Sequence, residues 1–233
     1  MVRDESNMYD ISLEMDELGE KLGGGLPRGS IVLIEGSEGS GRSVLSQRLS
    51  FGAMTYGLET TFISTEMTMR DYIDQMYSLD YKIAKFLQRG KLLYIPVYPL
   101  IGQTGKRGDF LGRLMSSAPL YASDIIVIDS LSTLVDATLS KDSSLELLAF
   151  FKRMSNMGKT IIITIEEGNR DLDPFRLASD VYLSMSYRKV GGSVSRTINV
   201  RRYIRARDRV DDIIGFRVEP GIGLVVEITE VSG

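Results

Sequence analysis

The sequence predicts an α/β fold in which a mainly parallel central sheet is flanked by helices and extended by antiparallel strands at its C-terminal edge. Apolar, β-branched runs alternate with helical patterns between Ile31 and Ile165, as in successive βαβ units. The run Ile125–Ile128 has no polar position, which is typical of a parallel strand covered on both faces. After Asp180, strand patterns follow one another directly, which favours antiparallel pairing.

The alternating part predicts five strands with helices between them. The expected strands are Ile31–Glu35, Thr60–Ser64, Leu92–Pro96, Ile125–Ile128 and Thr160–Ile165. Helical patterns cover about 43–56, 68–76 and 143–157, and a further helix is expected before Asp124. Thr68 and Asp71 have the spacing of a capping box, and Gly158 is a typical C-terminal stop. The stretch Gly102–Gly112 holds four glycines and predicts a mobile loop.

The last part of the chain predicts four more strands joined by turns. They are Val181–Tyr187, Val194–Ile204, Ile213–Val218 and Leu224–Ile228, with turn signals at Gly191-Gly192 and Pro220-Gly221. No internal repeat or low-complexity linker interrupts the pattern. Residues 1–233 are therefore expected to form one domain.

The composition excludes several kinds of chemistry. The chain has no cysteine, which removes disulfides, thiolate metal sites and cysteine nucleophiles. It also has no histidine, so catalysis would depend on carboxylates, Lys/Arg, hydroxyls and a hard cation. The net charge of −3 does not suggest a general nucleic-acid binder. The charged N-terminus is unlike a signal peptide, and no stretch approaches the ~20 apolar residues of a membrane span, so we expect a soluble, cytoplasmic protein.

A phosphate-binding loop is predicted directly after the first strand. Gly36 and Gly41 bracket four residues and precede a basic residue and Ser43, which matches the P-loop pattern except that Arg42 replaces lysine. Backbone N–H groups and the N-terminus of the next helix would bind phosphates, and the Ser43 hydroxyl would bind Mg²⁺. The alternative is a glycine-rich turn. The residues expected to contact ATP are Gly36, Ser37, Glu38, Gly39, Ser40, Gly41, Arg42, Ser43 and Val44.

Arg42 is a departure with a chemical consequence. Lysine is a compact point charge, whereas arginine is longer, planar and forked. Arg42 can neutralise phosphate without reproducing the geometry that supports hydrolysis. The sequence therefore predicts nucleotide binding more strongly than turnover.

Two carboxylates at strand ends are candidates for the metal and for catalysis. Asp129 follows Ile125–Ile128 at the end of the sheet where α/β proteins bind ligands, and we expect it to hold Mg²⁺ through water. Glu66 follows the second strand and could orient or deprotonate the attacking water. Both could instead be ordinary loop or capping residues. Glu166 and Glu167 lie at the same end of the sheet and fit a nucleotide sensor or a plain loop equally well.

The segment Leu22–Ser30 resembles the LGGGxPxGS prelude of the RecA/RadA/KaiC superfamily. Within it, further segments resemble the FlaH family of the archaeal flagellum, or archaellum; they are Ser64–Thr68, Gln75–Leu79, Gly90–Val97, Gly158–Thr164 and Val218–Gly223. The resemblance implies a RecA-like core that binds ATP and docks as a ring with the motor ATPase FlaI under the membrane protein FlaJ. It also implies a nucleotide-dependent regulator or scaffold more than a fast hydrolase.

Members of the wider superfamily often carry a K-x-R motif that reaches a neighbour's γ-phosphate. The matching place reads Tyr203-Ile204-Arg205, so the first basic residue is absent and Arg205 is left as a candidate finger acting in trans. Six arginines lie between positions 196 and 209. They fit ring contacts or a solvated strand face better than a nucleic-acid stripe, because Asp208, Asp211 and Asp212 are interleaved with them.

Three functions follow as hypotheses. The first is an ATP- and magnesium-binding regulatory or scaffold component of the archaellum motor, placed in the cytoplasm at the inner face of the membrane, with weak or no hydrolysis. The alternative is a RadA-like DNA-dependent recombination ATPase, although no basic and aromatic DNA-binding loop is evident. A KaiC-like autokinase ranks last, because no second ATPase half is visible.

Overall fold

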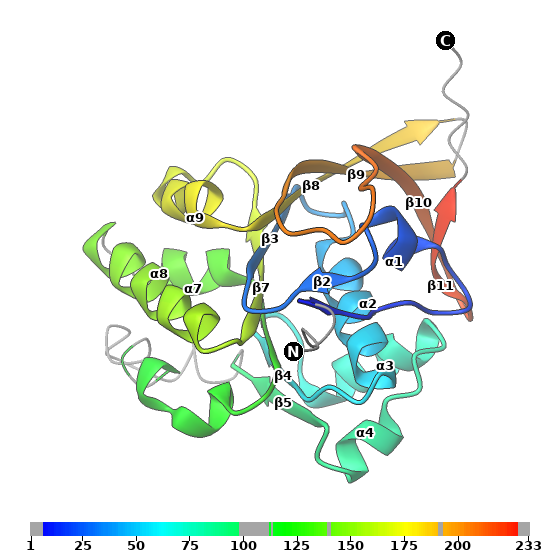
Figure 1. Cartoon of the computed structure of the whole chain (residues 1–233). Coiled ribbons are helices and arrows are strands. Elements are labelled where there is room, and N and C mark those ends of the chain that lie inside the picture. Colours follow the sequence, from blue (N-terminus) through cyan, green and yellow to red (C-terminus); the bar gives the residue numbers. More distant parts are fainter. Residues whose placement is uncertain (1–6, 98–111, 113, 139–140, 191–192, 228–233) are drawn as a thin grey trace, which may run out of the picture.

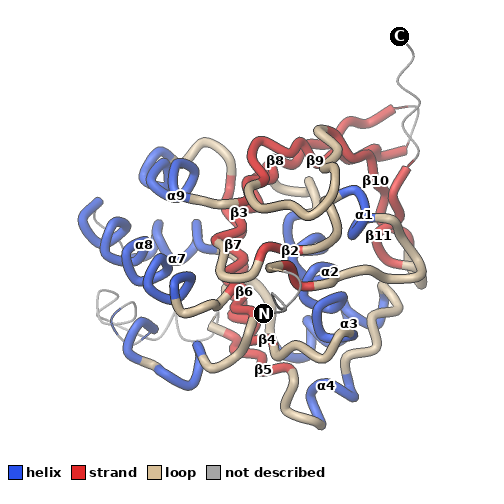
Figure 2. The backbone as a smooth tube through the Cα atoms, viewed as in Figure 1, coloured by secondary structure: helices blue, strands red, loops and turns tan. Residues whose placement is uncertain are grey.

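The computed structural model of the chain describes residues 7–97, 112, 114–138, 141–190 and 193–227. A nine-stranded sheet in the order β11-β10-β9-β8-β3-β7-β6-β4-β5 passes through these residues, and a small sheet pairs β1 with β2. Helices lie on both sides of the large sheet (Figure 1). The tube view shows the strands as a layer between two groups of helices (Figure 2). The predicted α/β architecture is confirmed.

The five strands predicted for the alternating part are all present. They are β3 (Ile31–Gly36), β4 (Thr60–Ser64), β5 (Leu92–Pro96), β6 (Ile125–Asp129) and β7 (Thr160–Glu166). Every pairing among them is parallel. All residues of β3, β4 and β6 are buried, as expected for strands covered on both faces.

Different helices pack against the two faces of the sheet. Alternation along β3 directs Val32 and Ile34 into one core cluster and Ile31 and Leu33 into another. Helices α2 (Arg42–Thr55), α3 (Met69–Ser78) and α4 (Ala84–Gln88) supply the first cluster; α7 (Leu131–Thr138), α8 (Lys141–Asn156) and α9 (Asp173–Ala178) supply the second. Short 3-10 turns, η1 (Ala118–Tyr121) and η2 (Arg170–Leu172), complete the connections.

Most predicted helices are confirmed. The Thr68–Asp71 capping box is formed in both directions at the start of α3. Leu114–Ser116 is helical, in the region where a helix was expected before Asp124. Helices α4, α7 and α9 were not predicted. The expected glycine-rich loop falls outside the described residues apart from Gly112.

The antiparallel extension is confirmed with one refinement. Strand β8 (Val181–Val190) pairs parallel with β3 and antiparallel with β9 (Ser193–Tyr203). Strands β10 (Ile213–Glu219) and β11 (Gly223–Glu227) continue the antiparallel order to the edge. The first C-terminal strand therefore belongs to the parallel part, and reversal begins at β9.

The N-terminal segment is attached to helix α2 by a buried ion pair. It contains β1 (Met8–Tyr9), α1 (Leu18–Lys21) and β2 (Leu26–Pro27). Arg48 of α2 donates through Nε and Nη2 to the two carboxylate oxygens of Asp16, each at 2.6 Å, and through Nη1 to the Ile11 carbonyl at 2.8 Å. Both charged side chains are almost fully buried. The bidentate geometry satisfies charges that burial would otherwise make costly.

The glycine run before β2 makes close backbone contacts that a side chain would block. Gly25 has φ of 131°, and a Cβ placed there would lie 2.1 Å from the Tyr9 carbonyl oxygen. The Tyr203 hydroxyl donates to the Gly25 carbonyl, and Arg207 and Asp208 donate backbone N–H bonds to Gly23. The glycines thus connect the N-terminal segment with the chain that follows β9.

Replacing Gly25 by alanine is expected to destabilise the protein by about 2 kcal/mol or more, or roughly 4–8 °C in Tm, because it adds a steric overlap to backbone strain. Gly57→Ala is the matched control, since Gly57 also has positive φ, of 88°, but has no atom within 4 Å of an added Cβ. Thermal unfolding followed by circular dichroism measures both. Equal losses in the two variants would contradict the close-contact explanation.

Candidate functional site

The loop after β3 has the geometry of a phosphate cradle. Gly39 and Gly41 adopt positive φ angles of 79° and 96°, and helix α2 begins directly afterwards at Arg42. A Cβ on Gly36 would lie 2.6 Å from the Ser40 hydroxyl and 2.7 Å from the Met185 carbonyl. The loop can therefore curl tightly at the helix N-terminus only because these positions are glycine.

Two polar groups of this loop are buried without a partner among the described residues. They are the Ser40 hydroxyl and the Nη1 nitrogen of Arg42. Burying such groups costs free energy unless a ligand or water satisfies them. One is a charged donor and the other a hydroxyl, beside a helix N-terminus. This set fits an anionic group such as a phosphate.

Glu35 fixes the end of the strand that leads into the loop. Its carboxylate accepts bonds from Arg176 of α9, at 3.0 Å from Nε and 2.5 Å from Nη2, and from the Tyr182 hydroxyl of β8. Arg176 also donates to the Asn169 carbonyl at 2.7 Å. The start of the phosphate loop is thereby tied to the segment that follows β7. Sequence reasoning missed this network, because its members are far apart along the chain.

Asp129 lies against the first turn of α2. Its Oδ1 atom accepts a bond from the Ser43 hydroxyl at 3.1 Å and another from Thr164 of β7 at 2.6 Å. Burial raises the pKa of Asp129, and the bonds from Thr164 and Ser43 oppose that rise. The structure thus brings together the two predicted metal ligands. Ser43 and Asp129 supply the oxygen ligands that Mg²⁺ prefers, and no group of three or more acidic residues that could hold a metal occurs in the described ranges.

Glu66 lies in the loop after β4, at the same edge of the sheet. Its backbone N–H donates to the Ser64 hydroxyl at 3.3 Å, and the Tyr94 hydroxyl donates to the next carbonyl, that of Met67, at 2.8 Å. Burial raises the pKa of Glu66, as does the negative charge of Asp129, while Arg42 lowers it. Glu66 is therefore within electrostatic range of the loop and of Asp129. A carboxylate with a raised pKa is suited to accept a proton.

The chain as a whole is similar to known ATP-binding proteins. A family model described as "ATPase: KaiC" matches residues 12–229. The archaeal flagellar ATP-binding protein FlaH of Methanocaldococcus jannaschii is 39% identical, with 95% of this chain and 97% of the relative covered. The FlaH protein of Methanococcus voltae is 38% identical over 95% of this chain and 98% of its own length.

The crystal structure of the flagellar accessory protein FlaH from Methanocaldococcus jannaschii superimposes with a TM-score of 0.88 at 38% identity, covering 95% of this chain and all of the other. The chain belongs to the FlaH family. A KaiC-like protein from Pyrococcus horikoshii, at 21% identity and a TM-score of 0.73, shares the fold. The FlaH resemblance and the RecA/KaiC-like fold predicted from the sequence are both confirmed.

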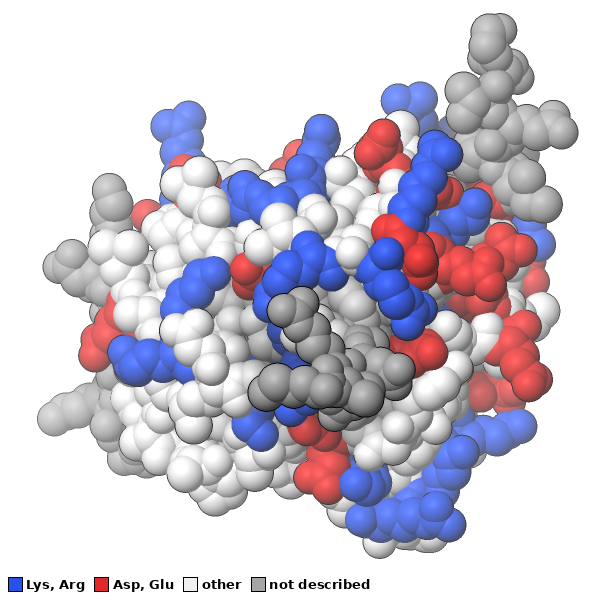
Figure 3. Space-filling view, in the orientation of Figure 1, with Lys and Arg blue, Asp and Glu red and all other residues white. Residues whose placement is uncertain are grey.

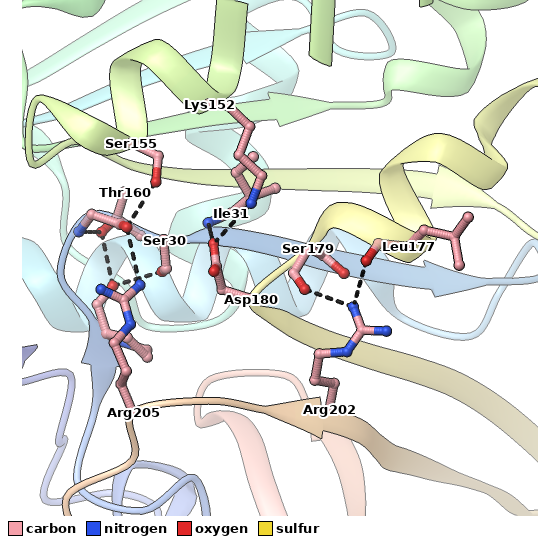
Figure 4. A network of polar contacts seen from close by, with 12 residues as sticks. Ser30, Ile31, Lys152, Ser155, Thr160, Leu177, Ser179, Asp180, Arg202 and Arg205 are labelled. Carbon is pink, nitrogen blue, oxygen red and sulfur yellow. Dashed lines mark hydrogen bonds and ion pairs between the residues drawn. The ribbon is translucent and has the colours of Figure 1, made fainter. Parts of the chain in front are cut away.

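In this member of the FlaH family, Arg205 lies far from its own phosphate loop. It donates to the carbonyls of Arg28 and Gly29 at 3.1 and 3.0 Å, at the amino end of β3, whereas the loop follows the carboxyl end (Figure 4). Arg202 similarly donates to the Ser179 carbonyl at 2.7 Å after α9. Arg205 is therefore not brought to the site within one protomer. Its predicted action in trans stays a prediction.

The arginine cluster is divided among different contacts. Arg196 alone among the six contacts the phosphate loop, by donating from Nε to the Gly39 carbonyl at 3.2 Å. Its position was missed, because the pairing register of β9 is not evident from the sequence. On the face in Figure 3, acidic side chains gather over the edge that carries α1 and β10, and basic ones are scattered. Within the described ranges, no helix is long and apolar enough to cross a membrane.

Asp129→Asn is expected to raise Tm at pH 7.5 in metal-free buffer by about 2–4 °C, or roughly 1 kcal/mol in a chain of this size. Burial raises the pKa of Asp129 in the folded state, so folding favours the protonated carboxyl. The stability that Asp129 contributes is therefore fully present below its pKa in the unfolded chain, and it is lost as the pH rises through its pKa in the folded protein. Asparagine avoids that loss while its oxygen still accepts the bonds from Ser43 and Thr164.

Thermal unfolding between pH 3.5 and 8 measures this effect. The difference in Tm between the variant and the wild type should shrink toward zero as the pH falls to about 4, near the ordinary pKa of an aspartate. A difference that does not change with pH would show that the ionisation of Asp129 is not its cause.

Proposed function

We propose that this chain is the ATP- and magnesium-binding regulatory or scaffold component of the archaellum motor, and that its nucleotide state controls assembly with the motor ATPase FlaI. The observation that carries the proposal is the phosphate loop, whose buried Ser40 Oγ and Arg42 Nη1 have no hydrogen-bond partner in the described part of the chain, next to the buried carboxylate of Asp129. The FlaH relatives, which are named as archaeal flagellar ATP-binding proteins, support ATP binding and a role in the archaellum.

Binding would use groups that the fold already holds in place. Backbone N–H groups of residues 39–44 and the N-terminus of α2 would bind the phosphates, and Arg42 would neutralise their charge. Ser43 and Asp129 would hold Mg²⁺, with phosphate oxygens and water completing its shell. A bound cation would offset the cost of burying the Asp129 carboxylate.

Hydrolysis is proposed to be weak. In this proposal Glu66 orients or deprotonates the attacking water, and its raised pKa in the folded protein supports a role as proton acceptor. Arg42 is the limiting residue in this proposal, since its forked head cannot take the place of a compact ammonium between two phosphates. The site would then hold ATP long enough to act as a signal.

Assembly would be the readout of the bound nucleotide. We propose that copies of this chain form a homo-oligomeric ring and that this ring docks with FlaI under the membrane protein FlaJ. The assembly would lie in the cytoplasm at the inner face of the membrane. Thermodynamic linkage requires ATP to bind one assembly state more tightly than another. The loop that carries Glu66 and the end of β7 at Glu166 are the elements proposed to report nucleotide, because the charge of Glu166 acts on Glu66 beside the phosphate loop.

Arg42→Lys is expected to bind Mg-ATP with affinity similar to the wild type and to release phosphate about tenfold faster, because the ammonium fits between phosphates. Arg42→Ala should bind at least about tenfold more weakly, through loss of a charged hydrogen bond. Calorimetry and a phosphate-release assay measure both quantities. Alanine binding as tightly as the wild type would remove the proposed role of Arg42.

The affinity of the protein for FlaI is expected to differ at least about fivefold between Mg-ATP and nucleotide-free conditions, the low end of typical allosteric coupling. Biolayer interferometry with immobilised FlaI measures this affinity. The Asp129→Asn variant is the control, because its affinity for FlaI should not depend on magnesium when ATP is present. Equal affinity for FlaI in both conditions would contradict the regulatory function and leave ATP binding intact.

A further inference from the structure

The side of the phosphate loop opposite Glu66 and Asp129 carries a separate group of side chains. Asp129 on β6 and Glu66 after β4 lie on one side of β3 in the sheet order, and β8, β9 and β10 lie on the other. Chemistry at a terminal phosphate would occur beside the carboxylates. The nucleoside, at the other end of the phosphate chain, would then leave the loop toward β8 and β9.

A row of three side chains crosses those strands at the level of the loop. Tyr187 pairs with Arg196, and Arg196 pairs with Phe216. Each lies two positions along its strand from a core residue that packs on the α2 side: Tyr187 from Met185, Arg196 from Ile198 and Phe216 from Ile214. Because side chains two apart share a face of a strand, the row lies on the α2 side of the sheet.

Contacts place this row directly against the loop. Tyr187 ring atoms lie 3.9 and 4.0 Å from the position of a Cβ on Gly39. Arg196 Cδ and Phe216 Cζ each lie 3.4 Å from the corresponding position on Gly41. The Nε bond to the Gly39 carbonyl, at 3.2 Å, fixes the guanidinium beside the loop. Phe216 is fully buried, whereas Tyr187 is 39% exposed, so part of it is accessible to a ligand.

Arg196 retains donors for that ligand. Its Nε atom makes the one hydrogen bond found for its side chain among the described residues, which leaves both Nη nitrogens available. A planar guanidinium next to an aromatic ring can stack on a base or donate to its acceptor atoms.

We propose that Tyr187 and Arg196 form the nucleoside-binding surface of this site, with Tyr187 stacking on the base and Arg196 donating to nucleoside acceptor atoms. The proposal rests on the proposed ATP binding and adds the part of the ligand that the phosphate loop does not contact. It also predicts that the surface prefers an aromatic base but selects little between bases, since stacking is tolerant of base identity.

The test compares Mg-ATP with magnesium tripolyphosphate, which carries three phosphates and no nucleoside. In wild-type protein, calorimetry should show tighter binding of Mg-ATP. Tyr187→Ala should weaken Mg-ATP binding about tenfold, in line with the loss of one base–aromatic stack, and change tripolyphosphate binding less than about twofold. Arg196→Ala should also weaken Mg-ATP more than tripolyphosphate. Tyr187→Phe should retain wild-type affinity for both.

Arg188→Ala is the matched control, because Arg188 is the next residue of β8 and points to the other face of the sheet. It should leave both affinities unchanged. If Tyr187→Ala and Arg196→Ala reduced both affinities equally, the row would support the loop and the nucleoside role would be wrong. Unchanged Mg-ATP binding in both variants would also overturn it. Wild-type protein that bound tripolyphosphate but gained nothing from the nucleoside would refute this inference alone; binding neither ligand would refute the proposed function with it.

Discussion

The coverage of the central strands by helices on both faces is the constraint on which the rest of the structure depends. Such strands have no solvated side, so their polar side chains collect where the strands leave the helical layers. Because β3, β4, β6 and β7 are parallel, their carboxyl ends lie together at one end of the sheet. The phosphate loop, Glu66 and Asp129 meet there for the same reason. The chemistry of the site is thus a consequence of the packing.

Residues whose constraints are local were predictable from the sequence. The phosphate loop could be found because Gly36 and Gly41 bracket four residues before Arg42 and Ser43, between a strand pattern and a helix pattern. Gly41 indeed adopts a positive φ that favours glycine. The strand before Asp129 was evident from its unbroken apolar run. The short amphipathic helix α7 (Leu131–Thr138), which begins two residues after Asp129, was not predicted from the sequence.

Residues whose position depends on pairing between distant strands were not predictable. The sequence groups Arg196 and Arg205 in one cluster, but β9 runs antiparallel to β8 and places them at opposite ends of the sheet. Arg196 reaches the phosphate loop, and Arg205 binds the carbonyls before β3. The Glu35–Arg176 bond was also not predictable, because it depends on how helix α9 packs against β3, 141 residues away in the sequence. Strand register, which the sequence does not reveal, decides which of Arg196 and Arg205 contacts the phosphate loop.

The ion pair between Asp16 and Arg48 has a consequence for how this sequence can diverge. Loss of either partner alone leaves a buried charge with no counterion, which typically costs about 3–5 kcal/mol. Replacing both with apolar side chains of similar volume would avoid that penalty. The two positions, 32 residues apart, are therefore expected to be substituted together or to stay unchanged. Neutral variation is restricted at this pair even though neither residue touches the phosphate loop.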